Sequence, residues 1–135
     1  MKKSICIVIL FFVVFCAGVI FAEDVQTNES TVKVSSSAIC TSVSERMPEG
    51  INNEFSADVE KVYYWTKIDN AQGQKIKHVW KKGDTVLSEV KLSINSPSYR
   101  TWSSKTIYSD IKGQITISVI DESGKVIKEE GFTIK

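Results

Sequence analysis

The chain has 135 residues with 17 basic and 16 acidic side chains, one histidine and a formal net charge of +1. This length fits one compact domain with short appendages. The near balance of charge excludes the net positive charge that is typical of proteins that bind nucleic acid. The balance remains when Lys2 and Lys3 are left out, since the rest of the chain has 15 basic and 16 acidic side chains.

The N-terminus has the pattern of an export signal. Residues 1–3 carry two lysines, residues 5–22 are predominantly apolar, and Glu23 and Asp24 end the apolar run. A positive start followed by an apolar segment is typical of a signal peptide. The sequence therefore predicts a signal peptide over residues 1–22, with Ala22 as the last residue removed.

Two other interpretations of this segment stay open. At 18 residues it is long enough to span a bilayer as an uncleaved N-terminal anchor, which would be the chain's only membrane contact. Lipoprotein processing at Cys16 would prefer a small residue in front of the cysteine, where this chain has Phe15. All three interpretations predict an exported protein of the periplasm or cell envelope.

The export segment is followed by a polar stretch and then by a change of texture. Residues 23–37 are rich in Ser and Thr and poor in large apolar groups, which predicts a flexible linker. A single domain is expected over residues 38–135. That domain contains one cysteine, Cys40, so it has no internal disulfide and must be stabilised by packing.

The domain alternates between short apolar patterns of period two and turn residues, with almost no helical periodicity. The clearest alternation places Val86, Ser88, Val90, Leu92 and Ile94 on one face of a strand. A bulge is expected at Gly131. Strands are predicted at 38–44, 61–68, 75–81, 85–95, 99–103, 113–121 and 125–134. About seven short strands without helices predict an all-β, immunoglobulin-like antiparallel β-sandwich.

His78, the only histidine of the chain, lies in the predicted strand 75–81. It shares a face with Ile76 and Trp80, while lysines occupy the opposite face, so this face is expected to be the inner one. Three interpretations are open: a structural histidine hydrogen-bonded to backbone or a serine, a ligand contact, or a general base.

The residue types give little support for metal binding or for thiol catalysis. One histidine and one cysteine cannot supply the three or four nitrogen and sulfur ligands that zinc takes, so we expect no metal and no cofactor. Thiol catalysis would need Cys40 to lie beside His78, and nothing in their spacing indicates this. No catalytic residue is predicted.

A second aromatic and cationic segment runs from Tyr99 to Lys105. Alternation places Arg100, Trp102 and Ser104 on one face of a strand. Arg100 is expected either to stack on Trp80 or Trp102 as a structural element or to meet an anionic group in a cleft. A protein interface is the third interpretation. In the strand at 61–68, the face with Tyr63 and Trp65 is expected to be the core.

These segments resemble a known family. The matching stretches are Val62-Tyr63-Tyr64-Trp65-Thr66, Ile76-Lys77-His78-Val79-Trp80, Arg100-Thr101-Trp102-Ser103-Ser104-Lys105, Gly113-Gln114-Ile115-Thr116-Ile117, residues 121–124 and Phe132. Over residues 38 to 135 the chain resembles domain of unknown function 2914. The resemblance implies an exported or membrane-associated bacterial β domain without an assigned activity, so no catalytic residue is carried over.

The function expected from the sequence is a non-enzymatic binding or interaction module of the cell envelope, with a glycan or protein partner. The residues expected to bind the ligand are His78, Trp80, Arg100, Trp102, Ser104 and Lys105. Two alternatives are a small periplasmic hydrolase or lyase that uses His78, and a purely structural accessory domain. The enzyme alternative requires His78 to line a water-accessible cleft.

Overall fold

The computed structural model describes residues 31–135, all of whose regular structure is β-strand. The predicted signal peptide and the linker residues before Thr31 lie outside the described residues. Among residues 31–135, no helix is long and apolar enough to cross a membrane. The strands are β1 (Lys33–Cys40), β2 (Ser42–Ser44), β3 (Met47–Glu49), β4 (Glu54–Phe55), β5 (Lys61–Asp69), β6 (Lys75–Lys82), β7 (Thr85–Ser93), β8 (Ser98–Thr106), β9 (Gly113–Ile120) and β10 (Val126–Ile134).

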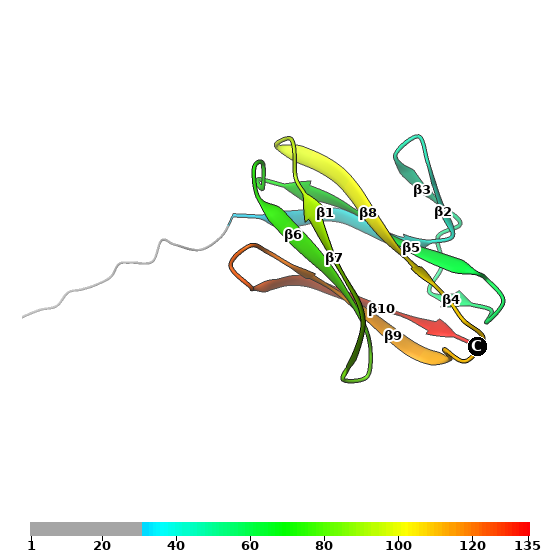
Figure 1. Cartoon of the computed structure of the whole chain (residues 1–135). Helices are drawn as coiled ribbons and strands as arrows, with labels where there is room; N and C mark the ends of the chain where they lie inside the picture. The colour runs from blue at the N-terminus through cyan, green and yellow to red at the C-terminus, as the bar shows by residue number, and fades with distance from the viewer. Residues whose placement is uncertain (1–30) are drawn as a thin grey trace, which may run out of the picture. The chain divides into compact units, whose positions relative to one another are not determined.

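Two sheets face each other as a sandwich, which confirms the predicted fold class. One has the strand order β1-β5-β8, and the other has the order β4-β10-β9-β6-β7 (Figure 1). The long pairings are antiparallel, and the short contact between β4 and β10 is parallel. The hairpin β2–β3 forms a separate two-stranded ribbon beside the three-stranded sheet.

The core lies between the two sheets and follows the period of two. The inward positions of β5 are completely buried, and so are those of β6. The ring of Phe132 on β10 meets Trp80 at 6.1 Å and Phe55 at 5.7 Å, both in edge-to-face geometry. Burial of each such large apolar side chain contributes about 1.5–3 kcal/mol to folding. These inward residues are Val62, Tyr64, Thr66 and Ile68 on β5, and Ile76, His78 and Trp80 on β6.

The domain begins earlier than the sequence indicated. Residues 33–37, predicted as the end of the linker, form the first half of β1 and pair with β5. Their Ser-rich composition reflects an exposed edge strand rather than a tether. The predicted strand 38–44 is also divided at Thr41, whose backbone N donates to the carbonyl of Glu49. Gly50 permits this close approach, since a Cβ there would lie 2.0 Å from the Thr41 hydroxyl.

Two bulges change the predicted faces. The register of β6 and β7 shifts between Trp80 and Lys81, so Val86 is 53% exposed while Leu87 packs against the core. The predicted alternation was therefore wrong at the start of β7, because the extra residue of a bulge reverses the facing of what precedes it. In β10 the shift lies between Val126 and Lys128, whereas Gly131 pairs regularly with Thr116, so the bulge predicted at Gly131 was misplaced.

Candidate functional site

Four side chains from both sheets form a hydrogen-bond network inside the core. His78 and Trp80 come from β6, Thr66 from β5 and Ser103 from β8. Thr66, His78 and Trp80 are completely buried and Ser103 is 5% exposed. The alternation of each strand places all four on inward faces, which is why strands far apart in sequence contribute to one network. We call this the inter-sheet network.

The direction of each hydrogen bond follows from its neighbours. Trp80 Nε1 donates to Ser103 Oγ at 3.1 Å, and Thr66 Oγ1 donates to the carbonyl of Thr101 at 3.1 Å. Because the hydroxyl proton of Thr66 is used in this way, Thr66 Oγ1 accepts from His78 Nε2 at 3.2 Å. Ser103 Oγ then donates to His78 Nδ1 at 2.7 Å. The bonds therefore run in one direction from Trp80 to Thr101, through a neutral imidazole with its proton on Nε2.

Burial explains the protonation state of the imidazole. Desolvation lowers the pKa of His78 from 6.5 to about 3, because burial removes the water that would hydrate a charged ring. The ring of Tyr64 lies against the imidazole at 4.9 Å. His78 has no exposed surface and lines neither of the two grooves described below. The structural interpretation, a histidine bonded to a serine, describes this residue.

The outer face of the three-stranded sheet holds a second cluster. Trp65, Ala38 and Cys40 are buried there, with Tyr63 and Trp102 packed against them at partial exposure. The Tyr63 and Trp65 face is buried as predicted, but in this second, smaller cluster, because Tyr64 on the opposite face points between the sheets. The β2–β3 hairpin lies over this outer face, and the carbonyl of Arg46 accepts a hydrogen bond from Trp65 Nε1 at 2.9 Å.

The thiol of Cys40 belongs to this outer cluster and is completely buried. Burial raises the pKa of the thiol, which favours the unreactive protonated form. His78 lies on the inward face of the other sheet. Cys40 and His78 therefore do not form a catalytic pair.

Arg46 stacks over the aromatic rings, a role the sequence had suggested for Arg100. The Arg46 guanidinium carbon is 5.3 Å from the ring centre of Tyr99 and 5.5 Å from that of Trp102. Its Nη2 also donates to the carbonyl of Arg100 at 2.7 Å, while Arg100 Nη1 lies 3.4 Å from Met47 Sδ. The predicted stacking of Arg100 on Trp80 or Trp102 was wrong, because Trp80 is enclosed in the core and the hairpin brings Arg46 to Trp102.

These residues form an exposed patch that we call the aromatic–cationic surface. Its members are Arg46, Met47, Tyr99, Arg100 and Trp102. Arg46, Met47 and Arg100 are exposed, Met47 by 48%, and the two rings are half-buried. Within residues 31–135 the ion pairs are Lys77–Glu89 and Lys135–Glu54, so no carboxylate neutralises either arginine of the surface.

The six residues predicted to bind a ligand are divided between these places. His78 and Trp80 belong to the inter-sheet network and have no exposed surface. Arg100 and Trp102 lie on the aromatic–cationic surface, with Ser104 half-buried on the same strand face. Lys105 is half-buried and its ammonium lies 5.8 Å from the ring centre of Tyr108.

Two members of the surface, Arg46 and Met47, were missed by sequence analysis. Nothing in their local pattern marks them, since they follow a short strand and precede Pro48. Glu45 and Arg46 are the two central residues of the β2–β3 turn, with φ values of 51° and 64°. Positive φ at both positions is the geometry of a two-residue hairpin turn.

Among the depressions of the domain surface, two grooves stand out. The larger, with a volume of about 570 Å³, lies between β1, the segment before β4, and β10. The smaller, of about 230 Å³, is lined by Lys75, Lys77, Lys91, Asp121 and Glu122. No cluster of three or more histidine, cysteine or acidic side chains within residues 31–135 is arranged to hold a metal ion.

Comparison with known proteins identifies one matching family model. Residues 73–134 match the family model described as protein of unknown function (DUF2914), so the predicted family resemblance is confirmed. The matched segment covers β6 to β10, including His78, Trp80 and the Arg100–Lys105 segment, and is shorter than the predicted 38 to 135. No curated protein matches the chain.

Proposed function

We propose that this protein is an exported, non-enzymatic binding module of the cell envelope, whose aromatic–cationic surface recognises an acidic partner. The observation that carries the proposal is the Arg46 guanidinium over two aromatic rings, with neither Arg46 nor Arg100 in an ion pair among residues 31–135. The apolar segment at residues 5–22 supports export.

The chemistry of this surface suits an acidic glycan best. Half-buried aromatic faces offer an apolar platform for a sugar ring, and the guanidinium groups offer bidentate donors for a carboxylate or sulfate. Trp, Tyr, Met and Arg are also the residues enriched at protein interfaces, so an acidic protein is the second partner to test. The buried position of His78 supports a binding role over the hydrolase or lyase alternative.

The test is a binding assay with acidic and neutral glycans on an array, followed by titration calorimetry. Arg100→Gln removes a charge whose side-chain contact is Met47 Sδ, so the fold should tolerate it. We expect the variant to lose at least about tenfold in affinity for acidic ligands, the loss of one charge-assisted hydrogen bond. Lys128→Gln on β10, an equal charge change at another exposed position, is the matched control.

Two results would reject the glycan proposal: background retention of all acidic glycans by the wild type, or equal losses in Arg100→Gln and Lys128→Gln. If no acidic glycan binds but an acidic envelope protein is captured in an Arg100-dependent way, the partner of this surface is a protein.

A further inference from the structure

Glu130 lies where one face of β10 passes from the exposed Lys128 to the buried Phe132. It alternates with Phe132 and Ile134, which point into the core and are each 1% exposed. Partial burial of a carboxylate is costly unless hydrogen bonds or a cation compensate it. A local conflict of this kind, held in place by the rest of the fold, is expected at functional positions.

The carboxylate is held by two hydroxyl groups on one of its oxygens. Tyr64 OH donates to Glu130 Oε2 at 2.5 Å, and Ser37 Oγ donates to the same oxygen. No donor among the described residues reaches Oε1, and neither ion pair of this part of the chain involves Glu130. The buried phenol also keeps its proton, since burial and the neighbouring Glu130 raise the pKa of Tyr64. The site therefore has a fixed carboxylate with acceptor capacity to spare.

Glu130 lines the larger groove, which combines polar and apolar walls. Ser37, Asn52 and Asn53 contribute polar groups, while Ile51 at 63% exposure contributes an apolar wall. The groove, of about 570 Å³, is shallow and largely open to solvent. An alkyl stem ending in an ammonium group matches this combination, because the stem can lie along an apolar wall while the charge meets the carboxylate.

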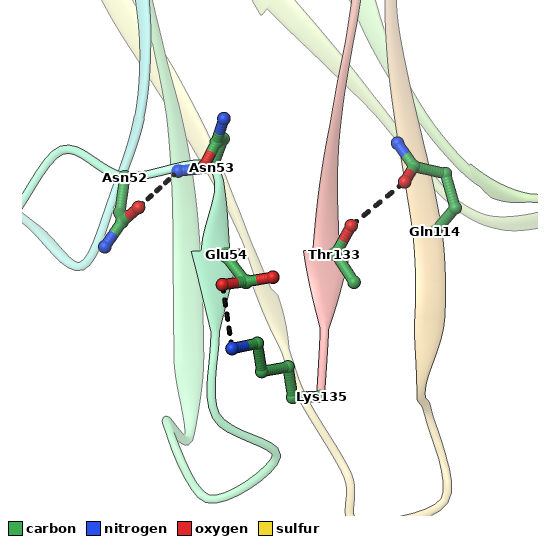
Figure 2. A network of polar contacts seen from close by, with 6 residues as sticks. All are labelled: Asn52, Asn53, Glu54, Gln114, Thr133 and Lys135. Atoms are coloured by element: carbon green, nitrogen blue, oxygen red, sulfur yellow. Dashed lines mark hydrogen bonds and ion pairs between the residues drawn. The ribbon is translucent and has the colours of Figure 1, made fainter.

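The wall of the groove is anchored to β10. Thr133 N donates to the carbonyl of Asn53 at 3.0 Å. Lys135 forms an ion pair of 2.9 Å with Glu54 (Figure 2). Figure 2 also shows Asn52 Oδ1 accepting from Asn53 N, which orders the residues just before β4. The groove is thus formed by fixed elements on both sides.

We propose that this groove is a second binding site, which takes a primary alkylammonium group such as a lysyl side chain, with Glu130 as its counter-ion. It shares no residue with the aromatic–cationic surface, so the two proposals succeed or fail independently. The ammonium can come from a lysine within a peptide or from a free amine, and both present the same chemistry to Glu130.

The experiment is an NMR titration of the chain without residues 1–22, using Nα-acetyl-lysine amide as the probe. We expect millimolar binding, with amide shift changes concentrated at residues 37–39, 51–53 and 130–131. A probe acetylated on the side-chain nitrogen has no charge and should not bind. An end-blocked Ala-Lys-Ala peptide distinguishes the sources: tighter binding than the amide indicates a peptide lysine, and equal binding indicates a free amine.

Glu130→Gln removes the charge but keeps an oxygen that can accept from Tyr64 and Ser37, so we expect a folded variant with at least about tenfold weaker binding. Glu129→Gln is the matched control, because Glu129 points to the opposite face, where it accepts from Ser118. Ile51→Lys, at an exposed position, should weaken binding by repulsion even if Glu130→Gln is unstable. Equal binding of charged and acetylated probes, or an unchanged affinity in Glu130→Gln or Ile51→Lys, would overturn the proposal.

Discussion

His78 Nδ1 accepts a hydrogen bond of 2.7 Å from Ser103 Oγ, so a histidine of the five-stranded sheet is joined to a serine of the three-stranded sheet through the middle of the core. The same serine accepts from Trp80 Nε1. Buried polar groups of this kind fix the relative position of two layers more specifically than apolar contacts, provided that every donor and acceptor is used. Here each ring nitrogen of His78 has one partner.

The serine at the centre of the network should matter far more than its neighbour in sequence. Ser103→Ala leaves His78 Nδ1 and Trp80 Nε1 without a partner in the core, and we expect it to lower the free energy of unfolding by about 1–3 kcal/mol. Ser104→Ala, at a half-buried position without these bonds, should change stability by no more than about 0.5 kcal/mol. Urea unfolding measures both, and equal effects of the two variants would contradict the structural role of the network.

The domain should lose stability on mild acidification because of His78. The folded pKa of about 3 lies below the ordinary value of 6.5, so the unfolded state binds more protons between these two values. Stability therefore rises with pH in this window and falls on acidification, by up to about 1.4 kcal/mol per pH unit. Urea unfolding between pH 7 and pH 4.5 checks the slope.

His78→Gln is the control for this pH dependence, since it keeps polar groups but cannot titrate. The variant should be less stable at pH 7 and show a flatter profile above pH 4.5. Hydrogen bonding from Ser98 lowers the pKa of Asp69 below its ordinary value of 3.8. Protonation of Asp69 therefore reduces stability only at a pH below the window that is measured for His78. A wild-type slope that persists in His78→Gln would assign the effect to other groups.

Tyr64 should remain protonated until the protein unfolds in alkali. Its raised pKa is caused first by burial and then by the hydrogen bond to Glu130, and the stability that it contributes is lost as the pH rises above 10. An ultraviolet titration should show the Tyr64 step coinciding with unfolding, whereas Tyr64→Phe should lose only that step. A Tyr64 step that is complete in the folded protein would refute the buried hydrogen bond.

The β2–β3 turn should be stabilised by glycine at one position. Glu45 has a φ of 51°, which is costly for a residue with a Cβ, and its side chain is exposed. Glu45→Gly should therefore raise the free energy of unfolding by about 0.5–1 kcal/mol. Glu49→Gly removes the same charge from strand β3, where glycine is unfavourable, and it should destabilise the domain. Destabilisation by both variants would indicate that the turn is not strained.

Much of the fold could be predicted because a strand has a period of two that is visible in the sequence. The boundaries of β5, β6 and β9 differ from the predicted ones by at most one residue. His78 and Trp80 were correctly placed on an inward face, since lysines mark the opposite face of β6. The charged residue at position 130, which shares its face with Phe132 and Ile134 on one side and Lys128 on the other, was visible in the same pattern but was not recognised.

The sequence by itself determined which side chains share a face of each strand, because successive residues of an extended chain point to opposite sides. Only the tertiary structure decided which of two apolar faces became the core, where bulges reversed the alternation, and that Arg46 rather than Arg100 covers Trp102. These outcomes depend on strand pairing, which joins residues 29 to 45 positions apart in β5 and β8, and on the hairpin over the outer face, where Arg46 meets Arg100, 54 positions away. Local spacing carries no information about such contacts.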